Sequence, residues 1–581
     1  MATEQVEEMK EDSNPEVDQA GMKEDWELGL DGMTMILNND WDQAQALFNT
    51  HKDTYPLMHA GNSLVMFMQA LMTFEEEKLS EAMKALKETE KKCEKADGFK
   101  SEFKKKSKKK IEQSVEDRLQ RQTIIADAIL YQAVLTFINQ DLSSYIKGGW
   151  LLRKAWKVYE KTYKEAKHLY EVCHGGTPNS TPAKNIKKSA SSPASLDSAS
   201  ISSVGQETVS RLLGAVSFGY GTFQLCISLV PPKLLKIIEL IGFEGDRDTG
   251  LKCLDFASHT RDMRAPMAML GLLWYHTVIR PFFALDGGNV DAGTEEATAL
   301  IERCQKEYPH SALFLFFKGR VERLKSELDA SLSTYNQALE SCGNQREIQL
   351  ICFHEIGWCH MMKLQWASAL ECFDRLKRDS RWSKSYYSYL SGVCQGAAGD
   401  VKGAEQHFSD VPGLVKRKNN QIEAFALQRA ERFKKNKPSQ EYCTLLGLEV
   451  LYLWNALPTC SKDTIQKMLE ECAKQMDKKV FHLQSLIEGT LFIQAGDEEM
   501  AMQCFKEAIA RHHGMKEDAH VAAFSHYELG VLMSGMPGQS EIGKKHLMDA
   551  KDNYKDYDFE NRLNVRIHAA LRRIKAEGTP L

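Results

Sequence analysis

The sequence predicts an all-α protein in which antiparallel helix hairpins stack into an elongated solenoid. Three observations support this fold class. Only 15 prolines occur in 581 residues, and the abundant Ala, Leu, Lys, Glu, Gln and Met residues favour helix over strand. A single spacing of small and aromatic residues recurs along the chain. The length also exceeds what one hydrophobic core usually holds, which favours several domains or a repeat array.

The recurring spacing joins a glycine, an alanine twelve residues later and a phenylalanine sixteen residues later. Four segments contain it: Gly32, Ala44 and Phe48; Gly357, Ala369 and Phe373; Gly392, Ala404 and Phe408; and Gly489, Ala501 and Phe505. A small residue on each of two helices lets their backbones approach closely, and the aromatic ring fills the gap toward the next hairpin. This period predicts a tetratricopeptide-repeat helical solenoid.

Short turns separate the two small residues of each copy, at 38–40, 363–365, 399–400 and 496–497. Three of them contain Asn, Asp or Gly, which end one helix or cap the next, and 363–365 is Lys-Leu-Gln. Weaker copies begin at Ala70, Gly319 and Gly530, and the last of these has a turn that is one residue longer. The alternative is a generic helical bundle in which the spacing is a coincidence.

Composition divides the chain into five segments. We expect a disordered acidic N-terminal tail (1–22), N-terminal helical repeats (23–172), a disordered Ser/Pro-rich linker (173–207), an irregular apolar helical segment (208–290) and C-terminal tetratricopeptide repeats (291–575). The tail and the linker lack the hydrophobic period that a packed core needs. The tail also lacks the apolar stretch of a signal peptide.

Three residues of the linker precede proline and are candidate sites of proline-directed phosphorylation. They are Thr177, Thr181 and Ser192. A phosphate at these positions would add negative charge to a segment that has no core of its own. The alternative is a linker that acts only as a spacer.

The irregular segment begins with nineteen residues, 212–230, that contain no charged side chain. This is close to the length of a helix that crosses a bilayer. Several glycine and polar residues lower its hydrophobicity, however, and Pro231 and Pro232 end it sharply. We therefore expect a helix buried on all sides within the solenoid, with a membrane span as the alternative.

No catalytic residue, cofactor or metal site is predicted. Residues 538–545 match the phosphate-loop pattern as far as its lysine, but Lys545 stands where a magnesium-binding Ser or Thr is needed. The segment before it, 525–533, has the pattern of an amphipathic helix and not of a strand. The motifs HExxH and GxSxG and paired Cys/His metal spacings do not occur. Fourteen cysteines are scattered singly, which is typical of reduced thiols in the cytosol.

Nucleic acid is not an expected partner. The formal net charge is −5, which gives no overall attraction to a polyanion. The lysine-rich run at 104–110 lacks the interleaved aromatic residues that stack on bases. We interpret it as a solvated segment.

Six stretches of the chain carry a more specific pattern. They are Gly-Tyr-Gly-Thr-Phe-Gln-Leu at 219–225, Leu-Val-Pro-Pro-Lys-Leu-Leu-Lys at 229–236, Ile-Gly-Phe-Glu-Gly-Asp-Arg at 241–247, Arg-Ala-Pro-Met at 264–267, Trp-Tyr-His-Thr-Val-Ile at 274–279 and Asn-Asn-Asp-Trp-Asp-Gln-Ala at 38–44. In these stretches the chain resembles the tetratricopeptide repeat protein 39 family, from Trp26 to near the C-terminus without the linker. The resemblance implies a helical-repeat scaffold without catalysis and supplies no functional residues.

The turn at Asn38 and the Ser-rich insertion are most similar to the C-type members of that family, for which the resemblance implies a role in cilium assembly. We therefore expect a non-enzymatic cytoplasmic scaffold, associated with the cilium, that holds a peptide or helix of a partner protein in the solenoid groove. The alternative is a lipid- or membrane-associated protein. It would act in lipid homeostasis, as other members of the family do, through the apolar region 208–286.

Overall fold

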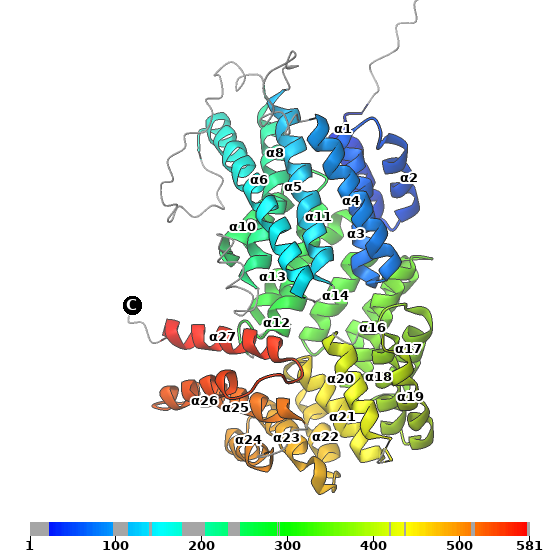
Figure 1. The fold of residues 1–581 in the computed structure, drawn as a ribbon, viewed down its shortest axis with the longest axis vertical. Coiled ribbons are helices and arrows are strands. Elements are labelled where there is room, and N and C mark those ends of the chain that lie inside the picture. The colour runs from blue at the N-terminus through cyan, green and yellow to red at the C-terminus, as the bar shows by residue number, and fades with distance from the viewer. Residues whose placement is uncertain are drawn as a thin grey trace, which may run out of the picture.

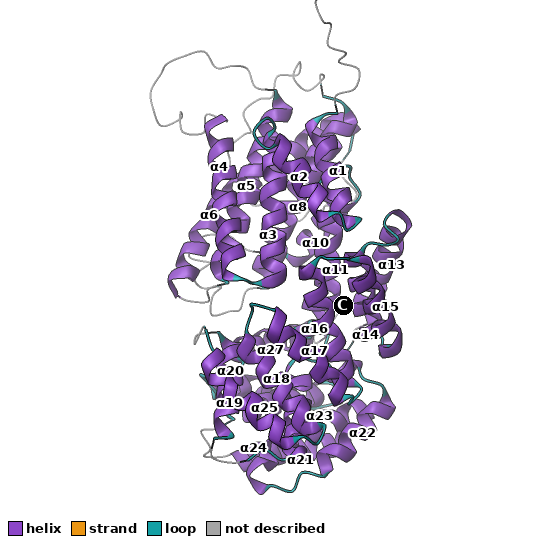
Figure 2. Ribbon diagram, turned by 90° about the vertical axis from the view of Figure 1, so that its right-hand side faces the viewer, coloured by secondary structure: helices purple, strands orange, loops and turns teal. Residues whose placement is uncertain are grey.

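A computed structural model describes most of the chain, and every element that it describes is a helix (Figures 1 and 2). The described residues are 23–96, 114–138, 142–176, 204–229, 245–287, 289, 291–416, 420–434, 437–512 and 518–577. The expected acidic tail and the lysine-rich run at 104–110 lie outside these residues. The fold class is the predicted one, an all-α solenoid of helix hairpins.

The first half of the chain forms four hairpins followed by a broken helix. In each hairpin, α1/α2, α3/α4, α5/α6 and α8/α10, the two helices pack against each other. The elements are α1 (Asp25–Leu37), α2 (Trp41–His51), α3 (Pro56–Thr73), α4 (Glu76–Ala96), α5 (Val115–Phe137), α6 (Leu142–His174), α8 (Gln206–Ser228), α10 (Arg247–Ser258), α11 (Ala265–Trp274), the π-helix η2 (Tyr275–Ile279), α12 (Arg280–Phe282) and α13 (Asp291–Glu307).

The second half continues the stack, and the two helices pack against each other in the hairpins α14/α15, α16/α17, α18/α19, α23/α24 and α25/α26. The elements are α14 (Ala312–Leu324), α15 (Leu328–Ser341), α16 (Arg346–Met362), α17 (Trp366–Asp379), α18 (Lys384–Ala397), α19 (Val401–Leu414), α20 (Gln421–Arg432), α21 (Gln440–Leu453), the 3-10 helix η3 (Leu457–Thr459), α22 (Lys462–Ala473), the 3-10 helix η4 (Lys478–Val480), α23 (Phe481–Ala495), α24 (Glu498–His512), α25 (Ala519–Ser534), α26 (Ser540–Asp552) and α27 (Glu560–Glu577).

Each glycine of the recurring spacing lies against the phenylalanine sixteen residues after it. A Cβ atom on Gly32 would overlap the ring of Phe48, and so would one on Gly61 in the next hairpin. The ring of Phe48 is therefore held between α1 and α3. The other copies have the same geometry. A Cβ atom added to the glycine would lie 2.9 Å from the ring of Phe373 at Gly357, 2.8 Å from the ring of Phe408 at Gly392 and 2.7 Å from the ring of Phe505 at Gly489. The paired alanines are fully buried, namely Ala44, Ala369, Ala404 and Ala501.

The turn inside these hairpins also repeats. The seventh residue after the glycine has a positive φ in each copy: 71° at Asn39, 56° at Leu364, 102° at Gly399 and 87° at Gly496. The next N–H then donates back to a carbonyl of the first helix, as from Asp40 to Met35 at 2.8 Å. This left-handed helix end favours Gly or Asn, so Leu364 adopts it against its intrinsic preference.

The segment that was expected to be irregular forms a helix pair with its own close contact. A Cβ on Gly221 in α8 would lie 2.8 Å from the carbonyl oxygen of Gly250 in α10, so the two backbones nearly touch. The apolar side chains of α8, such as Val216 and Phe223, are buried in the stack. Among the described helices, none combines the length and the apolar character that a membrane crossing requires.

A buried polar cluster joins α5 and α6 to the segment before α11. The hydroxyl of Tyr159 donates to Asp127 Oδ1 at 2.6 Å, and Arg264 Nε donates to Asp127 Oδ2 at 2.7 Å. The backbone N–H of Arg264 donates to Asp262 at 2.9 Å. A Cβ on Gly219 in α8 would overlap both Tyr159 and Asp127. Gly219 and Arg264, two residues of the more specific pattern, therefore build one buried cluster.

The two halves have separate hydrophobic cores that meet at α14–α16. One core contains residues from Met33 to Cys352 and the other from Leu328 to Ala570. Contacts between distant parts of the chain reinforce this junction. They include the ion pairs Arg346–Glu75 at 2.6 Å and Arg381–Glu77 at 3.1 Å, and the hydrogen bonds of the Asn39 side chain with the His310 carbonyl and the Ala312 N–H, both at 2.9 Å.

The last helix packs against the middle of the molecule, where Figure 1 shows α27 beside α12. Its arginines donate to carbonyls of two distant segments: Arg566 to Phe282 at 2.9 Å, Arg573 to Ala284 at 3.1 Å and Arg562 to Leu453 at 2.8 Å. The solenoid therefore closes on itself at its C-terminal end.

The glycine–aromatic contact predicts the effect of one methyl group. Gly32→Ala gains helix propensity but forces the buried ring of Phe48 out of place, so we expect a loss of about 1–3 kcal/mol in the free energy of unfolding. Gly271→Ala is the matched control, because a Cβ there meets no atom within 4 Å. It should leave stability unchanged or raise it by up to about 1 kcal/mol. Urea unfolding followed by circular dichroism measures both, and equal midpoints would contradict the packing argument.

The buried cluster predicts a larger effect. Arg264→Ala leaves Asp127 buried without its cation, so we expect a loss on the order of 3–5 kcal/mol. Arg261→Ala is the control, since Arg261 makes an exposed ion pair with Glu207 at 2.9 Å and should matter much less. The two variants can be compared by thermal unfolding at pH 7. Similar melting temperatures would show that the cluster does not stabilise the fold.

Candidate functional site: a groove among helix N-termini

The repeat residues predicted from the sequence are distributed along the stack and buried in it, so they do not converge on one site. Their observed contacts are those between neighbouring helices described above. The candidate phosphorylation sites Thr177, Thr181 and Ser192 lie outside the described residues. The functional surface must therefore be sought among residues that the spacing did not single out.

The phosphate-loop resemblance at 538–545 falls on a helix turn. Gly538 has φ 75° at the start of α26. A Cβ on Gly543 would lie 2.6 Å from the carbonyl oxygen of Gly530 in α25, so this glycine serves the packing of two helices. All fourteen cysteines are free thiols. Burial raises the pKa of several of them, as for Cys359 to about 11, which keeps them protonated and unreactive at neutral pH.

A groove of about 1170 Å³ opens in the C-terminal half. It lies where the N-termini of α21, α23, α25 and α27 gather beside the C-terminus of α20. Its lining consists of Gln428, Glu431, Arg432, Phe433, Lys434, Lys437, Ser439, Tyr442, Asp477, Lys479, Val480, His482, Asp518, Ala519, Asp556, Tyr557 and Asp558. Capping residues are frequent at these positions because helix N-termini leave backbone N–H groups to be satisfied. Ser439, for example, accepts from the N–H of Tyr442 at 3.1 Å.

A network of buried charges underlies the groove. Arg429 in α20 donates to Glu449 in α21 at 3.0 Å and also pairs with Asp518 before α25. Arg432 donates to Asp518 at 2.7 Å. His482 of α23 bonds to Asp518 at 2.9 Å, and His520 of α25 bonds to Glu449 at 2.9 Å. The network thereby connects α20, α21, α23 and α25.

The arginines keep both carboxylates ionised. Burial would raise the pKa of Asp518, but Arg429 beside it holds that pKa well below 3.8. Burial and Arg429 oppose each other in the same way at Glu449, where the net result is a pKa below 4.5. Two cations therefore face two anions beneath the groove, and each carboxylate is already occupied by a guanidinium and an imidazole.

The rim carries exposed charges of both signs together with aromatic rings. Glu431, Lys434, Lys437, Asp477, Lys479 and Asp556 are exposed. The rings of Phe433 and Tyr442 lie 5.6 Å apart by their centroids, and Phe433 stacks on Phe408 at 4.2 Å. Such a surface can bind a segment that offers both charges and apolar side chains. Sequence reasoning missed it because its residues come from five elements and share no spacing.

Comparison with known proteins gives a match to one family model and similarity to several solved structures. The family model described as Iml2/Tetratricopeptide repeat protein 39 matches residues 30–513. Among solved structures, a human IFIT1 dimer with PPP-AAAA is 14% identical and covers 85% of this chain and 96% of that chain, with a TM-score of 0.28. The APC/C hetero-tetramer Cut9–Hcn1 is 12% identical and covers 95% of this chain and 96% of that chain, with a TM-score of 0.23. Yeast Tom70 is 10% identical and covers 89% of this chain and 98% of that chain, with a TM-score of 0.22. No functional conclusion follows from structural similarity at this level.

The network predicts a specific dependence on pH. Asp518→Asn removes one of the anions that face Arg429, so we expect a loss on the order of 3 kcal/mol at pH 7. Because the folded-state pKa of Asp518 lies well below 3.8, the wild type keeps its advantage at all pH values above the unfolded-state pKa. The advantage should shrink only as the pH falls below about 4. Urea midpoints of both proteins at pH 7, 5 and 3.5 test this, and a difference that is already gone at pH 5 would contradict it.

Proposed function

Since the chain belongs to the Iml2/Tetratricopeptide repeat protein 39 family, we propose that it is a non-enzymatic scaffold that holds a segment of a partner protein in the groove among the helix N-termini. The observation that carries this proposal is the groove itself, with its mixed charges and aromatic rings. They lie over the ionic floor, the buried network of Arg429, Arg432, Glu449 and Asp518. A preorganised floor lowers the entropic cost of binding, which favours a fixed recognition surface.

The size and chemistry of the groove favour a peptide over a small molecule. Its volume of about 1170 Å³ is above the usual 300–1,000 Å³ of small-ligand pockets. Exposed Lys434, Lys437 and Lys479 suit acidic side chains, while Phe433 and Tyr442 suit apolar ones. Alternation of such groups is a property of peptide segments and helices. The engaged state of Asp518 and Glu449 leaves neither carboxylate free to act as a base, which supports a binding role without catalysis.

We also propose that the partners serve cilium assembly and that the protein works in the cytoplasm. Support comes from the similarity of the turn at Asn38 and of the Ser-rich insertion to the C-type members of the family. The alternative role in lipid homeostasis gains no support from α8, because the apolar side chains of this helix are buried in the stack. The groove supports the scaffold proposal whichever process the partner serves.

A pair of matched variants tests the groove. The variant Lys434→Glu/Lys437→Glu/Lys479→Glu makes its rim acidic, and the control Lys402→Glu/Lys462→Glu/Lys551→Glu changes three exposed lysines elsewhere. In proximity labelling of ciliated cells, the labelling of groove partners should fall at least about ten-fold with the first variant, which corresponds to a loss of about 1.4 kcal/mol in binding free energy. With the control, the labelling of these partners should stay constant. A photoreactive residue at position 479 should cross-link to the same partners.

Identical partner sets for the two variants would overturn the groove as the binding site. The cilium role has its own outcome in the same cells. After removal of the protein, the fraction of ciliated cells should fall, and the wild type and the control variant should restore it. An unchanged fraction would refute the role in cilium assembly while leaving the groove result intact.

A further inference from the structure

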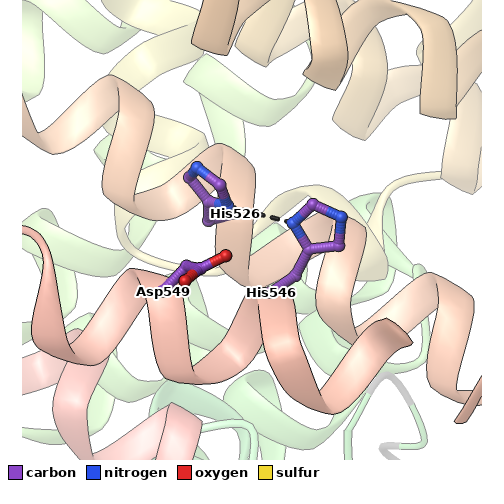
Figure 3. Close-up of side chains that lie close together, drawn as sticks. All are labelled: His526, His546 and Asp549. Atoms are coloured by element: carbon purple, nitrogen blue, oxygen red, sulfur yellow. Dashed lines mark hydrogen bonds between the residues drawn. The ribbon is translucent and has the colours of Figure 1, made fainter. Parts of the chain in front are cut away.

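Three potential metal ligands converge on the outer part of the α25/α26 hairpin, apart from the groove. His526 lies on α25, and His546 and Asp549 lie one turn apart on α26. Their candidate ligand atoms are all within 4.8 Å of one another. The Nδ1 atoms of the two histidines are 3.0 Å apart. Figure 3 shows the two imidazole rings facing each other, with the Asp549 carboxylate beside them.

The packing of the hairpin places these residues opposite each other. Gly530 and Gly543 bring the two backbones together, because a Cβ on either residue would meet the carbonyl oxygen of the other at less than 3 Å. His526 lies one turn before Gly530, and His546 lies nearly one turn after Gly543, so both point into the same antiparallel interface. Residues three apart on a helix share one face, which adds Asp549 to this side. The arrangement thus follows from the same close approach that builds the repeats.

We propose that His526, His546 and Asp549 bind a divalent transition-metal ion, with Zn²⁺ as the best match. Two imidazole nitrogens and one carboxylate oxygen form a common catalytic-type donor set for this ion. On a tetrahedral Zn²⁺ with Zn–N bonds of 2.0–2.1 Å, two nitrogens are about 3.3 Å apart. The observed 3.0 Å between the Nδ1 atoms therefore requires a shift of only a few tenths of an ångström.

The hydrogen bond between the two rings suits a metal site. A hydrogen bond between two Nδ1 atoms needs one of them as an acceptor with a free lone pair, and a lone pair of this kind is what a metal ion binds. Without metal, one Nδ1–H donates to the other Nδ1. With metal, the proton of each ring resides on Nε2, and both Nδ1 atoms are ligands.

Other groups around the site complete its electrostatics. Asn553 Nδ2 donates to Asp549 Oδ1 at 3.2 Å and orients the carboxylate. Asp549 supplies the one negative charge, while Lys545 and Lys506 lie near His546 and oppose a cation. The lysines are exposed, so solvent screens them. All three ligands are partly exposed as well, which leaves the fourth coordination position to water.

A bound ion would cross-link α25 to α26 and stabilise the last hairpin before α27. This role is independent of the peptide groove, whose lining contains none of the three ligands. A metal site can be distinguished from a plain hydrogen bond between the two histidines, because only metal binding requires the carboxylate of Asp549.

Calorimetric titration of the chelator-treated full-length protein with Zn²⁺ tests the proposal. Wild type and His568→Gln, which changes an exposed histidine of α27, should bind one equivalent with equal affinity at this site. His546→Gln and Asp549→Asn should each weaken that binding at least about ten-fold, since even outer-shell partners of metal ligands cost this much. Circular dichroism of the metal-free proteins checks that each variant is folded.

The absorption spectrum of bound Co²⁺ supplies a second readout. A tetrahedral site should give visible d–d bands in the wild type and in His568→Gln, and these bands should disappear in His546→Gln. If all four proteins give the same Zn²⁺ isotherm and the same Co²⁺ spectrum, the site does not exist. Loss of binding in His546→Gln alone, with Asp549→Asn unchanged, would overturn the three-ligand assignment.

Discussion

The contact between a glycine and a buried aromatic ring is the constraint on which the rest of the structure depends. Phe48 occupies the space that side chains at Gly32 and Gly61 would otherwise fill, and it belongs to the helix between them. Truncating such a ring leaves a cavity that typically costs about 3–5 kcal/mol. Because the contact involves three helices of two successive hairpins, it fixes both the spacing inside a hairpin and the step to the next one.

Closure of the stack adds a second constraint that the repeats alone do not impose. In an open solenoid each repeat contacts only its neighbours. Here Glu75 in the turn after α3 pairs with Arg346, and Glu77 at the start of α4 pairs with Arg381, about 270–300 residues later in the chain. The last helix, α27, bonds to carbonyls of α12 and α21. These long-range bonds couple the two hydrophobic cores. They also hold α27 in position beside the N-termini of α21, α23 and α25, where the groove forms.

Much of this architecture was predictable from local sequence, and the reason is physical. A helix pair that must approach closely needs small residues at a fixed offset, and a left-handed helix end favours residues such as Asn39, Gly399 and Gly496. Both requirements leave a pattern in the chain. The ionic floor leaves none, because Arg429 lies 20 residues before Glu449 and 89 residues before Asp518 in the chain. The metal-binding trio was equally invisible, since His526 and His546 are brought together only by the hairpin.

Several residues of the more specific family pattern are explained by packing inside the protein. Three of its residues, Gly219, Gly221 and Arg264, are packing residues. Gly219 leaves room for the Tyr159–Asp127 bond, Gly221 lets α8 meet α10, and Arg264 neutralises Asp127. An unusual motif can therefore identify a family through its core.

The ionic floor beneath the groove requires a different explanation from stability. Replacing a buried ion pair by well-packed apolar residues is often neutral or stabilising, so the network of Arg429, Glu449 and Asp518 is not needed merely to fill space. Its distinctive property is geometry. A guanidinium satisfies two carboxylates only when its donors are correctly aimed, and these carboxylates stand on α21 and before α25. We infer that this condition restricts the relative placement of the helix ends more than an apolar contact would. The charges thus define the shape of the groove, and a surface of defined shape is what a selective scaffold requires.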